Sequence, residues 1–299
     1  MTVVDVVIPT YNHAPMLREA LSSLVAQTEP RWHAYVVNNN STDDTTQVID
    51  SFKDSRITRI DFANHGVIGA SRNTGITAGL AEFVAFLDSD DVWYSDKLAC
   101  VLAAFTTDVD LVCHAERWLE TDGTSRVIEY GRRGRDHYDG LLFGGNALST
   151  SAVTMRRTLL ERLRGFDTDP QIVTAEDYDL WLRASREGGR FVFLPQPLGE
   201  FRRRHGSESS RISRNAEAER AVLYKHFSVD CSPRERVRRR RRFALVDYGA
   251  ARSYQRDRAL RASWSSLLRC IFTYPLLVRP YAALVLLVRD TIFRNGANV

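Results

Sequence analysis

The first 90 residues alternate short apolar runs with segments of helical periodicity, and this alternation limits the fold more than any other feature. Val3–Ile8 is a β-branched run ended by Pro9, and Leu17, Leu21 and Leu24 then recur at helical spacing. The same succession predicts strands at residues 34–37, 57–61 and 83–87, with helices from about residue 41 and over residues 69–81. This order predicts an α/β fold with a mostly parallel sheet and helices on both faces.

Polar residues follow three of the predicted strands, at Thr10–Asn12, Asn38–Asn40 and Asp88–Asp91. Ligands of such sheets bind beyond the carboxyl ends of the strands, so we expect these loops to converge on one cleft. The turn after the first strand lacks G-x-G-x-x-G, which argues against a dinucleotide-dependent oxidoreductase.

The cluster Asp88-Ser89-Asp90-Asp91 concentrates negative charge directly after a buried strand. Carboxylates this close raise one another's pKa unless a cation joins them. Mg²⁺ bound to a diphosphate would suit them, because it prefers a couple of carboxylates plus phosphate oxygens. Alternatively, Asp90 or Asp91 caps the helix that contains Lys97 and Leu98. These four residues alone leave both interpretations open.

A set of motifs extends over residues 3–210, namely VVIPTYNHAPMLREALSSLVAQT, VVNNNSTDDT, GASRNTGI, FLDSDDVWYSDKL, GFD and AEDYDLWLRAS. In order and spacing they resemble the family 2 glycosyltransferases. The resemblance implies a GT-A (Rossmann-like) fold and an inverting, metal-dependent transfer of a sugar from a nucleotide-diphosphate donor, with a UDP-sugar as the expected donor. The implied acceptor is a hydroxyl of a glycan or lipid-linked molecule in the synthesis of cell-surface polysaccharide or glycoconjugate.

The resemblance also places a nucleotide site. Tyr11 could instead be a half-buried core aromatic, and Arg72 a surface ion pair. By resemblance, the base is bordered by Pro9, Thr10 and Tyr11. Base or ribose is contacted by Asn38 and Arg72. Ribose and metal are held by Asp88, Asp90 and Asp91.

Asn38 stands where the family usually has an aspartate for base recognition. An amide oxygen can accept a hydrogen bond from a uracil ring N–H, but the amide can equally donate. The identity of the base therefore stays open.

The pair Glu176-Asp177 opens a predicted helix whose apolar stripe includes Leu180, Trp181 and Ala184. Inverting displacement requires one base to take the proton of the acceptor hydroxyl. By resemblance Asp177 is the expected base and Glu176 the second choice. The alternative is that both acids only compensate the helix dipole.

His205, in FRRRHGSES, resembles a late element whose histidine approaches the metal or diphosphate in some family members. A lone histidine is more often an ordinary loop residue. The implied cofactor is Mn²⁺ or Mg²⁺, with Asp90, Asp91 and His205 as its expected protein ligands.

The positive charge lies in the tail. From Ser232 onward there are 15 Arg against four acidic residues, a net charge of +11, which leaves −7 for residues 1–231. We expect a catalytic domain over residues 1–231 and a basic, amphipathic α-helical region over residues 232–299. The Arg234–Arg242 run is a membrane-surface patch or a solvated helix face, while no nucleic-acid motif accompanies it. The competing interpretation is a hairpin that packs on the catalytic domain or in a homo-oligomer.

The four cysteines form no C-x-x-C pair, which favours a reducing compartment. The N-terminal residues lack the pattern of a signal peptide. We therefore expect a cytoplasmic protein, peripheral on the inner face of the cell membrane if the tail binds lipid. The alternative function is a non-catalytic, membrane-associated protein that retains the transferase fold.

Overall fold

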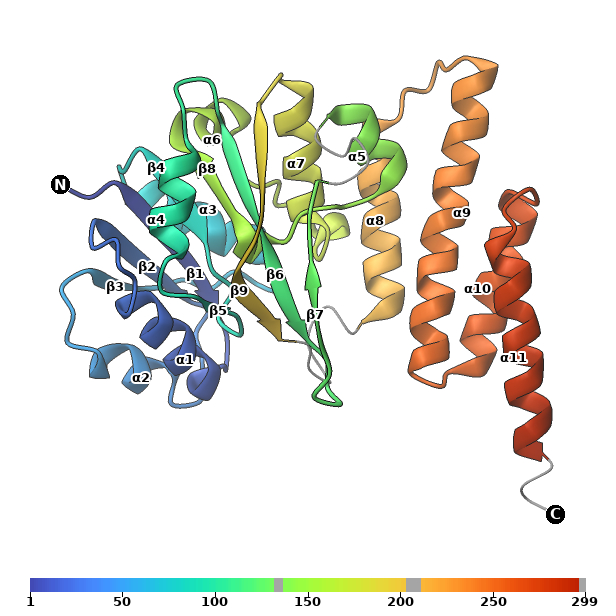
Figure 1. Ribbon diagram of the computed structural model, residues 1–299, viewed down its shortest axis with the longest axis horizontal. Helices are drawn as coiled ribbons and strands as arrows, with labels where there is room; N and C mark the ends of the chain where they lie inside the picture. The colour runs from blue at the N-terminus through green and yellow to red at the C-terminus, as the bar shows by residue number, and fades with distance from the viewer. Residues whose placement is uncertain (132–136, 203–210, 296–299) are drawn as a thin grey trace.

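The computed structural model describes residues 1–131, 137–202 and 211–295. Its first part consists of parallel strands joined by helices, as the alternation predicts (Figure 1). The elements are β1 (Val4–Thr10), α1 (Ala14–Val25), β2 (Trp32–Asn38), α2 (Thr45–Ser51), β3 (Ile57–Asp61), α3 (Ile68–Ala78) and β4 (Phe83–Phe86).

The second part adds antiparallel strands and a hairpin to this sheet. Its elements are β5 (Val92–Trp93), α4 (Lys97–Ala104), β6 (Leu111–Leu119), β7 (Ser125–Ile128), α5 (Tyr138–Gly144), the 3-10 turn η1 (Thr150–Ala152), β8 (Val153–Arg156), α6 (Arg157–Leu163), the 3-10 turn η2 (Pro170–Ile172), α7 (Glu176–Arg186) and β9 (Phe191–Arg202). Strands β6 and β7 form an antiparallel hairpin in this part.

One sheet runs through both parts. Among the described residues it has nine strands, in the order β3-β2-β1-β4-β8-β6-β9-β5, with β7 paired to β6. Strands β3, β2, β1 and β4 are mutually parallel, whereas β8 is antiparallel to both β4 and β6. The fold is thus mostly parallel but mixed: the first parallel block ends at β4, where the acidic cluster begins, and β6 and β9 form a second parallel pair.

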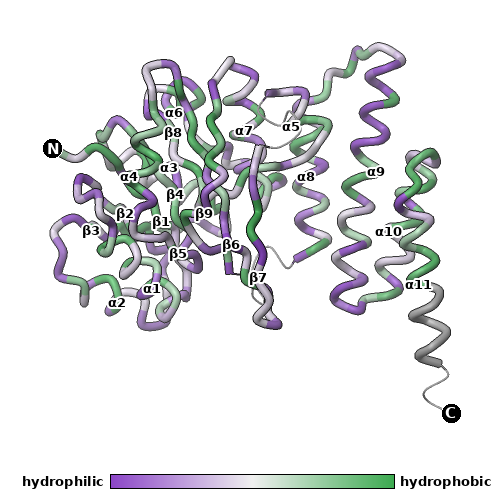
Figure 2. The backbone as a smooth tube through the Cα atoms, in the orientation of Figure 1, coloured by the Kyte–Doolittle hydropathy of each residue, from purple (hydrophilic) through white to green (hydrophobic). Residues whose placement is uncertain are grey.

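Side chains of β1 alternate between two cores. Val4, Val6 and Ile8 pack with α1 and α2 on one face, while Val7 packs with α3 and α7 on the other. This period of two is the geometry of a strand buried on both faces. Figure 2 shows the hydrophobic segments gathered in the central strands, between the helical layers.

Asp5, the one break in the first apolar run, is buried and paired. Its Oδ2 accepts from Arg157 Nη2 at 2.6 Å and from Ala81 N at 2.8 Å. Gly79 lies against the same carboxylate, and helix α3 ends at Ala78. The helix predicted over residues 69–81 therefore stops three residues early, because the chain turns here to meet Asp5.

The alternative that Asp90 or Asp91 caps the next helix is wrong. Strand β5 intervenes, and α4 begins only at Lys97, with Asp96 at its N-cap position. Both acids therefore belong to the loop at the carboxyl end of β4.

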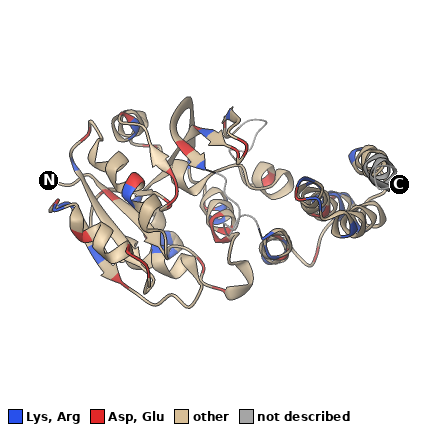
Figure 3. Cartoon of the chain, turned by 90° about the horizontal axis from the view of Figure 1, so that it is seen from below, with Lys and Arg blue, Asp and Glu red and all other residues tan. Residues whose placement is uncertain are grey.

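Four helices follow the sheet, namely α8 (Ile212–His226), α9 (Pro233–Arg256), α10 (Leu260–Thr273) and α11 (Arg279–Asn295). Helix α9 begins with a capping box formed by Ser232 and Glu235. Figure 3 shows Lys and Arg concentrated on the helices near the C-terminus. Within the described residues, no helix combines the length and the apolar run that crossing a bilayer requires.

The arginine run of α9 does not face one environment. Arg242 is 3% exposed and donates through Nε to the carbonyl of Leu142, and Arg238 forms an ion pair with Asp139. Val246 also joins the main core. A uniformly solvated helix face is therefore excluded. The domain boundary at residue 231 stays a prediction, although α9 shares its core with the part before it.

Candidate active site

Three loops meet at the carboxyl ends of β1, β2 and β4. The Asn12 side chain accepts from Thr42 N at 2.8 Å, and Asn12 N donates to Ser41 Oγ at 3.0 Å. On the other side, His13 Nδ1 lies 2.8 Å from Ser89 Oγ. The convergence predicted from the polar strand ends is confirmed.

The three asparagines that begin at the last residue of β2 have different structural roles. Asn38 is buried, accepts from Ser41 N through Oδ1 and donates through Nδ2 to Asp61 Oδ1 at 2.9 Å. Asn39 Oδ1 accepts from Asn64 N. Asn40 has a φ of 51°, in the left-handed region that asparagine tolerates better than most residues. The Asn38 amide is thus engaged on both sides, and Asp61 stands beside it.

Asp61 is a site residue that the motifs did not indicate. It ends β3 and is paired in register with Asn38 across the parallel ladder. Its position at a strand end could have identified it, but no motif marks it. A carboxylate therefore stands beside Asn38, one strand further along.

Arg72 joins the two acidic motifs of the site. Its Nη1 donates to Glu176 Oε1 at 2.5 Å and its Nη2 to Asp88 Oδ1 at 2.8 Å. The side chain is 4% exposed. Arg72 is therefore buried between the acids, and the alternative of a surface ion pair is wrong. Its predicted contact with base or ribose remains a prediction.

The acidic pair at the start of α7 is divided between two environments. Glu176 is buried, with Oε1 on Arg72 and Oε2 accepting from Thr174 N at 2.8 Å. Thr174 holds a φ of 85°, a strained value for a β-branched residue. Asp177 is half-buried. Burial, reinforced by the charge of Glu176, raises the pKa of Asp177 to about 7.

Three consecutive hydroxyl groups each donate to a different carboxylate. Ser149 Oγ reaches Glu116 at 3.2 Å, Thr150 Oγ1 reaches Asp177 at 3.3 Å, and Ser151 Oγ reaches Asp91 at 2.5 Å. Asn146 Nδ2 also donates to Asp177, at 3.2 Å. We call residues 146–151 the hydroxyl loop. It ties the acidic cluster to the predicted base, although the sequence there shows only an irregular pattern.

Glu116 is a further carboxylate that the motifs did not indicate. It lies in β6, is 1% exposed, and accepts from Tyr130 Oη at 2.6 Å. Burial raises the pKa of Glu116 to about 7. Burial also raises the pKa of Asp91 well above its usual range, with the charges of Asp90 and Glu116 adding to the effect. Negative charge is therefore crowded at this end of the sheet.

The residues predicted to border the base lie at the carboxyl end of β1. Pro9 pairs in register with Val37, and Thr10 pairs with Asn38. Thr10 Oγ1 is buried without a hydrogen-bond partner among the described residues. Tyr11 is 54% exposed, and its predicted place beside the base stays a prediction. His205 lies outside the described residues.

The acidic cluster fits a divalent cation held together with phosphate oxygens. Asp88 and Asp90 are half-buried at the site, whereas Asp91 is buried and accepts from Ser151 Oγ and from Arg202 N. No group of three or more acidic, histidine or cysteine ligands is assembled within the described residues. The donor set therefore suits Mg²⁺ or Mn²⁺, which need only a few carboxylates when a diphosphate supplies the rest.

The fold is shared with solved GT-A enzymes. A mannosyltransferase from Pyrobaculum calidifontis, in complex with GDP-Man and Mn²⁺, matches with a TM-score of 0.60 at 20% identity. The match covers 97% of this chain and 80% of that one. The architecture is therefore that of the GT-A class, followed by α-helices.

The family model for "Glycosyl transferase family 2" matches residues 5–163, and the chain belongs to this family. An uncharacterised glycosyltransferase from Nostoc is 35% identical over 179 residues, which cover 56% of this chain and 54% of the relative. The UDP-Glc:alpha-D-GlcNAc-diphosphoundecaprenol beta-1,3-glucosyltransferase WfaP of Escherichia coli is 28% identical over 63% of this chain and 72% of its own. The chain spans about half of the Nostoc relative and 30% of two further ones.

Proposed function

We propose that the protein transfers a sugar from a nucleotide-diphosphate donor to a hydroxyl of a glycan or lipid-linked acceptor, with inversion at the anomeric carbon. The observation that carries the proposal is the coupling of the acidic cluster to the acidic pair through Arg72 and the hydroxyl loop. The proposed leaving-group site and the proposed base thereby lie at the same end of the sheet. Family membership and the GT-A fold support the same chemistry.

Asp177 is the proposed base. It is half-buried, whereas Glu176 is buried and carries the ion pair with Arg72. A pKa near 7 suits a group that must accept the acceptor's proton at neutral pH. Thr150 and Asn146 donate to its Oδ2, and Tyr178 N donates to its Oδ1 at 2.6 Å. Glu176 is then a positioning residue that keeps Arg72 in place.

The donor diphosphate is proposed to bind beside Asp88 and Asp90. Asp90 is the proposed protein ligand of Mn²⁺ or Mg²⁺, with Asp88 and His205 as further candidates. Such an ion would stabilise the charge that develops on the leaving diphosphate. Asp91, already committed to Ser151 and Arg202, is better suited to hold the loop than to bind the ion directly.

The nucleoside is proposed to lie over the ends of β1 and β2, with Tyr11 exposed for stacking on the base. Asn38 and Asp61 form the polar edge that reads it. We retain a UDP-sugar as the proposed donor, because a carboxylate acceptor beside Asn38 suits the ring N–H of uracil. The similar proteins include one named for UDP-Glc and one solved with GDP-Man, so the donor must be measured.

The acceptor is proposed to be a lipid-linked glycan at the inner face of the cell membrane, in polysaccharide synthesis. The name of the Escherichia coli relative WfaP specifies a diphosphoundecaprenol acceptor, which supports this class. The tail would then contact an anionic membrane. A homo-oligomer is the other proposed partner of the tail.

The rival function is a non-catalytic, membrane-associated protein on a transferase fold. The test is Asp177→Asn. Sugar transfer should fall by about 10²–10⁴-fold, because a positioned base contributes on this order, while donor binding persists. Unchanged turnover would contradict the assigned base, and the absence of transfer by the wild-type protein with every donor tried would favour the rival.

A further inference from the structure

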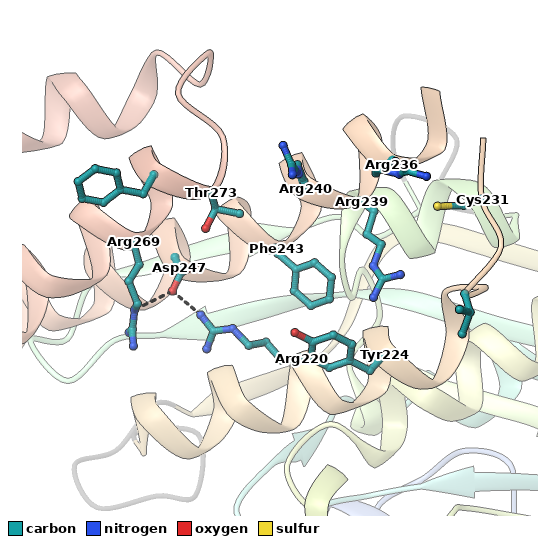
Figure 4. Close-up of a pocket in the computed structure, with 12 residues that line it drawn as sticks. Arg220, Tyr224, Cys231, Arg236, Arg239, Arg240, Phe243, Asp247, Arg269 and Thr273 are labelled. Atoms are coloured by element: carbon teal, nitrogen blue, oxygen red, sulfur yellow. Dashed lines mark hydrogen bonds and ion pairs between the residues drawn. The ribbon is translucent and has the colours of Figure 1, made fainter. Parts of the chain in front are cut away.

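Helices α8, α9 and α10 line a solvent-open pocket of about 950 Å³, away from the active site (Figure 4). Its walls are arginines and aromatic rings carried by all three helices. The lining residues used here are Arg220, Arg236, Arg239, Arg240 and Arg269 as the cations, Asp247 as the acid, and Tyr224, Phe243 and Phe272 as the rings.

The charge of this pocket is unbalanced. Five arginines face one aspartate, a net charge of +4 among the lining residues. Asp247 is engaged twice, by Arg220 and by Arg269 Nε at 3.3 Å. Within the described residues, Arg236 and Arg240 make no ion pair with an acid.

The helical spacing of the run explains this division of tasks. Arg238 and Arg242 are four residues apart and face the catalytic part, where they meet Asp139 and Glu219. Arg236 and Arg240 are also four residues apart, but line the pocket. One continuous run therefore holds the helix in place with one face and presents cations with another.

An exposed apolar rim borders the pocket. Phe272 is 83% exposed and Val229 is 93% exposed, and both line it. Leu276 and Val278, in the α10–α11 turn, are each 77% exposed. Phe272, Leu276 and Val278 are large, exposed and close together in the chain, which marks an interaction surface. Arginines beside exposed apolar residues match the interface of an anionic bilayer.

We propose that this pocket binds the phosphate head group of an anionic lipid, with its rim of Val229 and Phe272, and the exposed Leu276 and Val278 of the α10–α11 turn, in the acyl boundary. Arginine suits phosphate because its planar donors match the oxygens. The site locates the proposed membrane contact, and does not depend on the transferase activity. Lipid would contact the surface formed by α8, α9 and α10, and the donor would still reach the strand ends.

The test is sedimentation of the full chain with vesicles of equal parts phosphatidylglycerol and phosphatidylcholine. The double variant Arg236→Ala/Arg240→Ala should bind about 25-fold more weakly, since each arginine near an anionic surface contributes about fivefold. Vesicles of phosphatidylcholine alone should bind neither protein. The matched control is Arg18→Ala/Arg162→Ala, which removes the same charge from exposed positions on α1 and α6.

A second pair of variants separates the contribution of the apolar rim from that of the arginines. Phe272→Ala should weaken vesicle binding, whereas Leu80→Ala, 93% exposed between α3 and β4, should not. Equal binding by the arginine variant and its control would overturn the proposal. So would thermal stabilisation by inorganic phosphate without vesicle binding, or a dimer that Phe272→Ala converts to monomer. The arginine variant should still bind nucleotide. A loss of vesicle binding with nucleotide binding intact concerns only the lipid site and not the proposed transferase activity.

Discussion

Arg72 at the strand ends and Arg240 in the tail are both arginines, but their surroundings are opposite. Arg72 is 4% exposed and has a carboxylate on each side, Glu176 and Asp88. Arg240 lines an open pocket whose single acid, Asp247, is held by other arginines. The charge of Arg72 is neutralised by its own two acids before any ligand arrives, whereas the tail pocket carries positive charge that a partner must neutralise.

This difference indicates two uses of one side chain. A buried guanidinium with two acidic partners fixes geometry, because removing it leaves uncompensated charge in a poorly solvated place. A guanidinium without an acidic partner at the surface adds little to folding, but it attracts an anion. Stability measurements should therefore separate the two regions before any activity is assayed.

The largest expected effect is that of Arg72→Ala. Glu176 would be left buried without its cation, so the free energy of unfolding should fall by about 3–5 kcal/mol. Arg240→Ala should change it by less than about 0.5 kcal/mol, as for other surface substitutions. Chemical denaturation measures both. Similar losses from the two variants would remove the distinction drawn between the regions.

The next effect is on pH dependence. A base must be deprotonated to act, and the pKa of Asp177 is raised to about 7. The kcat/KM for transfer should therefore rise about tenfold per pH unit below 7 and level off above it. Asp177→Asn should lose this rising limb.

Glu116→Gln is the matched control, because burial also raises the pKa of Glu116 to about 7 but its partners are Tyr130 and Ser149. The control should keep the rising limb. If Glu116→Gln removed the limb and Asp177→Asn kept it, the base would have to be reassigned to Glu116.

The smallest effect is expected in the hydroxyl loop. Thr150→Val removes one hydrogen bond to Asp177, at 3.3 Å, and should lower kcat by about fivefold to tenfold, since such a bond contributes about 1 kcal/mol. Ser149→Ala, which loses only the bond to Glu116, should change kcat less. Steady-state kinetics with a saturating donor compares the two. An equal loss in both would indicate a general loosening of the loop.

The parts that sequence predicted well depend on local patterns. The four parallel strands and the loops after them follow from alternation, since apolar period and turn residues are properties of neighbours in the chain. Helix α7 also begins at Glu176-Asp177, as its apolar stripe of Leu180, Trp181 and Ala184 predicts. The family motifs added roles to these residues, and those roles remain to be tested.

The features of the site that could not be predicted from the sequence depend on contacts between segments far apart in the chain. Asn38 meets Asp61 across a strand pair, and Ser149–Ser151 meet acids from three other elements. Neither contact has a periodic signature. The split of the arginine run into two faces likewise depends on where α8 and α5 lie against α9.

The most direct test of the central claim is thermal stabilisation of the full chain by UDP, GDP and their sugar conjugates, each with and without Mn²⁺. A ligand of the folded state raises stability by about 2.7 kcal/mol at a hundredfold excess over its dissociation constant. One nucleotide should raise Tm, Mn²⁺ should increase the rise, and Asp90→Asn should abolish that increase. No rise with any nucleotide in the presence of Mn²⁺ would contradict it.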